Sequence, residues 1–84
     1  MDINIQTKFN IGDKVWVPGL YYEWYPMKNR YFITHIDIEI DSNDYQIFYI
    51  MKNENNSGQR YPDRLCFDSY DECEQWCMEN NKRR

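Results

Sequence analysis

Three cysteines and one histidine carry the most reactive side chains in this chain of 84 residues. A thiolate beside a histidine would be an activated nucleophile, and a group of thiolates with an imidazole could hold zinc. Cys66 is the cysteine that could face a histidine as a nucleophile. A zinc site would need all of the following residues: Cys66, Cys73, Cys77 and His35.

A plainer interpretation comes from the spacing of the last two cysteines. Cys73 and Cys77 lie one helical turn apart and, with Trp76 and Asn80, follow the i, i+3, i+4, i+7 spacing of a buried helical stripe. Buried thiols pack as small apolar side chains. An odd number of cysteines leaves one outside any disulfide scheme and is typical of a reducing cytosol. We therefore interpret all three as free thiols of a cytoplasmic protein.

The lone histidine sits in an alternating segment, where its place on the strand decides its surroundings. His35 shares a strand face with Asp37 and Glu39, opposite the face of the isoleucines between them. That face is expected to be wet, which makes a solvated histidine the favoured interpretation. We predict no enzymatic activity, no metal and no cofactor.

Aromatic residues gather in residues 19–29, a stretch without a clear period that we interpret as a long loop. An open cluster of such rings could receive a cation, a proline-rich peptide or a base. The alternative is that two or more rings plug an end of the fold, because a small domain needs them in its core. The predicted partner-binding rings are Tyr21, Tyr22, Trp24 and Tyr25, with Trp16 as a further candidate.

Acidic residues form two groups, and the net charge is −4. This charge argues against broad neutralisation of nucleic-acid phosphates, so nucleic acid is not the expected partner. A row of carboxylates could instead occupy a basic groove on another protein. The first group surrounds a predicted hairpin, contains no basic residue and completes the predicted site: Asp37, Glu39, Asp41 and Asp44. The second group lies around the predicted helix, where a solvated helix face is the simpler interpretation: Asp63, Asp68, Asp71, Glu72, Glu74 and Glu79.

The elements that must position these residues are strands followed by one helix, in a single domain over residues 1–84. Residues 1–8 are either disordered or an edge strand, residues 9–67 form a β meander or barrel, and residues 69–80 form the helix. Within the meander, strands are expected near residues 15–17, over 31–40, 45–51 and 59–61, and in a last short piece at 64–67. An exposed strand at 59–61 could pair with its copy in a homodimer.

The helix carries its own start signal. Ser69 can accept a hydrogen bond from the backbone N–H of Glu72, and Glu72 can reach back to Ser69. Acidic Asp71 and Glu72 in the first turn and a basic tail at residues 82–84 suit the helix dipole. The tail has a second interpretation as a partner-binding segment. No signal peptide or membrane span is evident.

The segment Ile11-Gly12-Asp13-Lys14-Val15-Trp16-Val17 and the hairpin spacing resemble SH3-like barrels of the Tudor and KOW type. With the ending Leu65 to Cys73, the chain is similar to small phage- or prophage-encoded proteins with a strand meander and a capping helix. The resemblance implies a non-enzymatic interaction module of a mobile element. By size and charge it is similar to inhibitors of bacterial defence systems such as anti-CRISPRs, which would bind a host protein. The alternative is a Tudor-like or KOW-like reader of a peptide or single-stranded nucleic acid.

Overall fold

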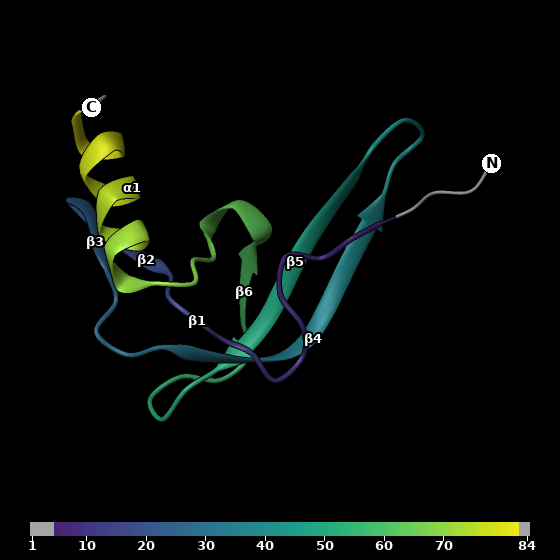
Figure 1. Cartoon of the computed structure of the whole chain (residues 1–84), viewed down its shortest axis with the longest axis horizontal. Helices are drawn as coiled ribbons and strands as arrows, with labels where there is room; N and C mark the ends of the chain where they lie inside the picture. The colour runs from purple at the N-terminus through teal and green to yellow at the C-terminus, as the bar shows by residue number, and fades with distance from the viewer. Residues whose placement is uncertain (1–4, 83–84) are drawn as a thin grey trace.

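The computed structural model describes residues 5–82, which form a curled antiparallel sheet, a separate hairpin and a C-terminal helix (Figure 1). This is the mainly β fold with one C-terminal helix that the sequence predicts. Residues 5–8 form neither helix nor strand, and predictions for residues 1–4, 83 and 84 lie outside the described residues. The elements are β1 (Lys14–Val15), β2 (Pro18–Tyr21), β3 (Glu23–Pro26), β4 (Tyr31–Ile40), β5 (Tyr45–Lys52), β6 (Gln59–Pro62), the 3₁₀ helix η1 (Asp63–Leu65) and α1 (Tyr70–Lys82).

The main sheet has the order β1-β4-β5-β6, and the long β4–β5 hairpin is its spine. A bulge between Ile33 and His35 interrupts the β4–β5 register, and the Thr34 hydroxyl there donates to the carbonyl of Ile50 at 3.1 Å. Bulges increase the local twist and bend the strand. β6 lies at one edge of this sheet, and pairing of β6 with its copy stays a prediction.

The curl brings the two ends of the sheet together. Trp16, next to β1, and Phe67, beyond η1, exchange backbone hydrogen bonds of 2.8 and 2.9 Å. This isolated bridge connects the segment after β1 with the segment after β6. The result is a strongly curled half-barrel, compatible with a small SH3-like barrel.

Alternation along the strands fills the concave side of the sheet. Tyr49 and Met51 are fully buried, whereas Phe48 and Ile50 lie on the outer face and are half-buried, as expected for a strand between two neighbours. The phenol of Tyr49 accepts a hydrogen bond from the backbone N–H of Phe9 at 3.1 Å. We call this cluster the sheet core: Phe9, Val15, Val17, Tyr31, Ile33, Tyr49, Met51 and Cys66.

A second cluster lies under α1. The Ser69 hydroxyl accepts a hydrogen bond from the backbone N–H of Glu72 at 3.2 Å, which confirms the first of the two predicted capping bonds. The helix ends at Lys82, two residues beyond the prediction. The predicted stripe packs inward, with Tyr70 partly exposed and edge-on to Trp16. We call this cluster the helix core: Phe67, Cys73 and Cys77, with Trp16, Trp24 and Trp76 packed against them.

The expected long loop over residues 19–29 is wrong, because most of it is the hairpin β2–β3. Its strands are joined by Tyr22 alone, at φ 63°, in register between Tyr21 and Glu23. Residues other than glycine rarely adopt this backbone conformation, and a tyrosine does not signal a tight turn in the sequence.

Two strand predictions also need correction. The segment at 64–67 forms the last part of η1 and one bridge residue, Phe67, because Pro62 cannot donate to a ladder and the chain turns at Asp63. The strand near residues 15–17 is shorter than predicted, since β1 ends at Val15.

Candidate functional site

The tip of the β2–β3 hairpin carries the most exposed large apolar side chains of the predicted site. Tyr21 is 71% exposed and Tyr22 is 84% exposed, and Leu20 beside them is 55% exposed. The two tyrosine rings meet edge to face, with centroids 4.6 Å apart. We call Leu20, Tyr21 and Tyr22 the tyrosine tip.

Trp24 has a different role from the other predicted rings. Its indole packs edge to face on Trp76 of α1 with a centroid distance of 4.9 Å, so it belongs to the helix core. The side chain of Asn81 accepts a hydrogen bond from the N–H of Trp24 at 2.7 Å and donates one to its carbonyl at 2.9 Å. Trp24 therefore fixes the hairpin to the helix, and a role of Asn81 was not anticipated from the sequence.

Tyr25 is partly packed against its own hairpin and partly exposed. It is the register partner of Gly19, and its ring covers the glycine so closely that a Cβ there would lie 2.7 Å from the ring. The ring remains 42% exposed. Tyr25 thus stabilises the base of the hairpin while keeping one side toward solvent.

The acidic residues of the predicted site occupy the β4–β5 hairpin. Asp41 and Asp44 flank its turn, where their carboxylates accept hydrogen bonds from the backbone N–H groups of Ser42 and Tyr45, both at 2.7 Å. These local bonds hold the turn and leave both acids exposed.

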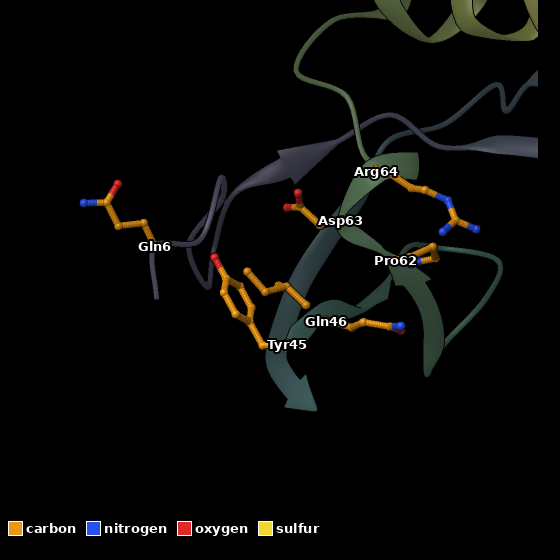
Figure 2. Close-up of a pocket in the computed structure, with 7 residues that line it drawn as sticks. Gln6, Tyr45, Gln46, Pro62, Asp63 and Arg64 are labelled. Carbon is orange, nitrogen blue, oxygen red and sulfur yellow. The ribbon is translucent and has the colours of Figure 1, made fainter. Parts of the chain in front are cut away.

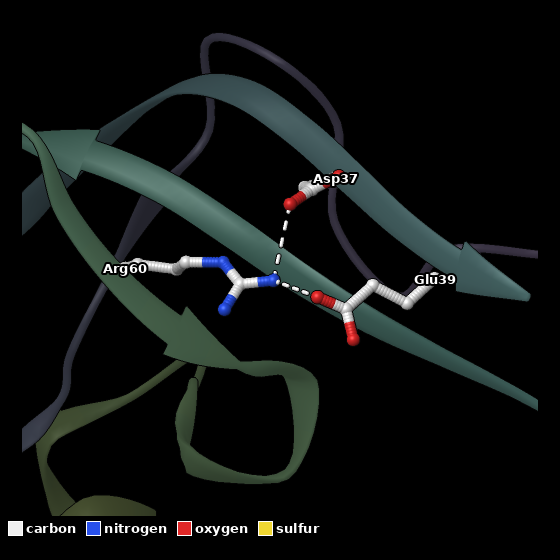
Figure 3. A network of polar contacts seen from close by, with 3 residues as sticks. All are labelled: Asp37, Glu39 and Arg60. Carbon is white, nitrogen blue, oxygen red and sulfur yellow. Dashed lines mark hydrogen bonds and ion pairs between the residues drawn. The ribbon is translucent and has the colours of Figure 1, made fainter.

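The other two predicted acids share a cation that comes from a different strand. The guanidinium of Arg60 on β6 reaches across β5 to Asp37 at 3.1 Å and to Glu39 at 2.5 Å (Figure 3). It lies 3.8 Å from the ring centroid of Phe48, and its pKa is raised chiefly by the hydrogen bond to Glu39. The sequence places no basic residue among these acids, but the fold brings Arg60 from β6 against Asp37 and Glu39, where it reduces their charge.

The two halves of the predicted site lie at opposite ends of the molecule. In Figure 1, the β2–β3 hairpin lies beside α1, and the turn of β4–β5 projects away on the other side. The longest dimension of the fold is 42 Å. The structure thus brings Asp37 and Glu39 together but does not bring the acids to the tyrosine tip.

The reactive side chains are also kept apart. His35 is exposed on β4 and contacts the Thr34 hydroxyl at 3.0 Å, whereas Cys66 is fully buried in the sheet core. Burial raises the pKa of Cys66 and of Cys73 to about 12, so both are protonated thiols near neutral pH. Residues 5–82 contain no group of three or more His, Cys, Asp or Glu arranged to hold a metal ion.

A shallow cavity of about 350 Å³ lies where β6 ends beside β5 (Figure 2). Asp63 on its wall already accepts a hydrogen bond from the phenol of Tyr49 at 2.7 Å, and this bond together with burial raises the pKa of Tyr49. The carboxylate of Asp63 is therefore already bonded to Tyr49 of the sheet core. The cavity is lined by Gln6, Tyr45, Gln46, Ile47, Pro62, Asp63 and Arg64.

No family model, curated protein or solved structure matches this chain. Within residues 5–82, the helix is too short and too polar to cross a membrane. Function is therefore inferred from the exposure, charge and contacts of the residues described above.

Proposed function

We propose that this chain is a non-enzymatic protein-interaction module that docks on a partner protein through the tyrosine tip. The main support for this proposal is the exposure of Tyr21 and Tyr22, which is 71% and 84%. Both lie on a hairpin that Trp24 and Asn81 attach to α1. Tyrosine is enriched at interface hot spots because it offers a large contact area and loses little conformational entropy on binding. A rigid hairpin reduces that entropy cost further.

The backbone at Tyr22 supports the same proposal. A bulky residue at φ 63° costs about 1–2 kcal/mol relative to a favourable conformation. Glycine would avoid this cost, because it adopts positive φ values readily. Strain of this kind is concentrated at functional positions, where the side chain is needed for binding.

The partner we propose is a host protein with a basic surface, bound by a protein of a mobile element that inhibits a bacterial defence system. The net charge of −4 and the exposed Asp41 and Asp44 favour a basic partner. A partner that contacts both the tyrosine tip and these acids must extend along most of the 42 Å length of the molecule.

Site-specific photo-crosslinking in bacterial lysate tests the docking surface. A benzophenone amino acid replaces Tyr21 in one variant and Met78, 54% exposed on α1, in the control. We expect a discrete protein adduct from position 21 that unmodified protein competes away, and none from position 78. Equal adducts from both positions, or no adduct from position 21, would contradict the proposal. A nucleic-acid adduct at position 21 would favour a reader of single strands instead.

A further inference from the structure

A basic and aromatic cavity lies on the main sheet, at the end of β4 away from the acidic turn. Lys14 of β1, Phe32 of β4 and Lys52 of β5 are register partners across three neighbouring strands. Such partners place their side chains about 5 Å apart on one face of the sheet. These residues, with Arg30 and Glu54, line a shallow cavity of about 270 Å³.

The ring of Phe32 is open to a ligand. Phe32 is 41% exposed on the outer face, and within residues 5–82 no cation lies over its ring. Phe48, on the same outer face, is covered by the guanidinium of Arg60 at 3.8 Å. One aromatic ring of this face is therefore covered by the protein, and the other is available for stacking.

The charge of this cavity is opposite to that of the whole chain. Lys14, Arg30 and Lys52 are exposed, and Glu54 is the acid among the lining residues. In the part of the chain from residue 5 to residue 82, every salt bridge belongs to Arg60, so these three cations have no carboxylate partner. Three cations around one open ring match a ligand with a flat aromatic group and a negative charge.

We propose that this cavity binds a nucleotide, with the base stacked on Phe32 and the phosphates held by Lys14, Lys52 and Arg30. Stacking on an exposed ring tolerates any base, and the cations supply charge without sequence selectivity. The nucleotide is either a free molecule or one unit of a single strand, since both present the same chemistry. The site is separate from the tyrosine tip and does not depend on the protein-docking proposal.

Titration followed by ¹H–¹⁵N NMR tests this site with four probes: ADP, adenosine, inorganic pyrophosphate and a thymidine octanucleotide. We expect saturable shifts at the backbone amides of Phe32, Lys52 and Glu54 with ADP, and weaker binding of adenosine and of pyrophosphate. An octanucleotide that binds more tightly than ADP identifies a single strand as the ligand. ADP binding as tight as the octanucleotide identifies the free nucleotide.

Surface variants separate this site from general charge effects. We expect F32A to weaken ADP binding about tenfold, as base stacking on an aromatic ring requires. K52A should lower the salt dependence of octanucleotide binding by about 0.7 in log–log slope. E54Q should strengthen binding by removing the cavity's carboxylate, whereas K82A on α1 should leave it unchanged.

Three results would overturn the assignment. The first is the absence of saturable shifts at Phe32 and Lys52 with millimolar ADP and with the octanucleotide. The second is pyrophosphate binding as tight as ADP binding, which would leave Phe32 without a role. The third is equal affinity of wild type and F32A when the spectrum of F32A shows an intact fold, which its position outside both cores favours.

Discussion

Asn81 of α1 pairs with the backbone of Trp24 of β3 as a neighbouring strand would. Its side-chain oxygen accepts from the Trp24 N–H at 2.7 Å, and its side-chain nitrogen donates to the Trp24 carbonyl at 2.9 Å. The amide is the side-chain group that offers both functions at this spacing. The hairpin with the tyrosine tip is thus attached to the last turn of the helix.

Replacement of Asn81 by alanine should destabilise the protein by about 2 kcal/mol, since each lost hydrogen bond contributes about 1 kcal/mol. N81D should be at least as destabilising, because its carboxylate would face the Trp24 carbonyl and the negative end of the helix dipole. Chemical denaturation measures both. The control is N80A, since the Asn80 side chain donates to the Trp76 carbonyl of its own helix, at 2.8 Å. Equal losses for N81A and N80A would contradict this role.

At position 22, a glycine substitution should give a more stable protein than an alanine substitution, which is the reverse of the usual order. At φ 63°, Y22G removes both the ring and the backbone strain, whereas Y22A removes the ring and keeps a Cβ. We expect Y22G to be more stable than Y22A by about 1 kcal/mol, measured by denaturant unfolding. The same pair at position 21, an ordinary strand residue, should show alanine as the more stable. A more stable Y22A would show that the left-handed conformation is not maintained.

The ion pairs of Arg60 should contribute little to stability. Their side chains are 43–57% exposed, and solvent screening weakens ion pairs of this kind. R60A should therefore destabilise the protein less than N81A does, even with the loss of stacking on Phe48, and added salt should shrink the difference from wild type. A loss as large as that of N81A that does not respond to salt would show that this arrangement is structural.

The buried thiols should make the protein sensitive to alkali. Burial raises the pKa of Cys66 and Cys73 from 9.0 to about 12, so between these values the folded state keeps protons that the unfolded state releases. The contribution of these thiols to the free energy of unfolding should be fully present below pH 9. Above pH 9 it should fall, on the order of 1 kcal/mol per pH unit for each thiol. Denaturant unfolding under reducing conditions from pH 8 to 11 measures this. C73A should reduce the slope, and an unchanged slope would argue against this burial.

The helix and the long strands were predictable because their signals are local. Ser69 and Glu72 form a cap within one turn, and the alternation from Ile36 to Ile40 correctly indicates a strand. The expected burial of its isoleucines is wrong beyond Ile36, because Ile38 and Ile40 are 38% and 62% exposed. The β2–β3 hairpin was missed because its connection is a single tyrosine in a conformation that sequence patterns assign to glycine or asparagine.

The geometry of the predicted site, and of the cavity around Phe32, depends on contacts distant in sequence. Arg60 reaches Asp37 and Glu39 only after β5 and β6 are paired. Lys14, 18 residues before Phe32 in the numbering of the chain, becomes its neighbour only through the β1–β4 register. Residue types alone therefore indicated aromatic and acidic binding groups, but not that they lie at opposite ends.

The backbone bridge between Trp16 and Phe67 also affects when this protein can fold during its synthesis. Phe67 must leave the ribosome before the half-barrel can close on the segment made first. Until then, the backbone N–H and carbonyl of Trp16 lack the partners that Phe67 supplies. A translation product that stops short of this residue would lack the closing bridge and would be a natural substrate for chaperones and proteases.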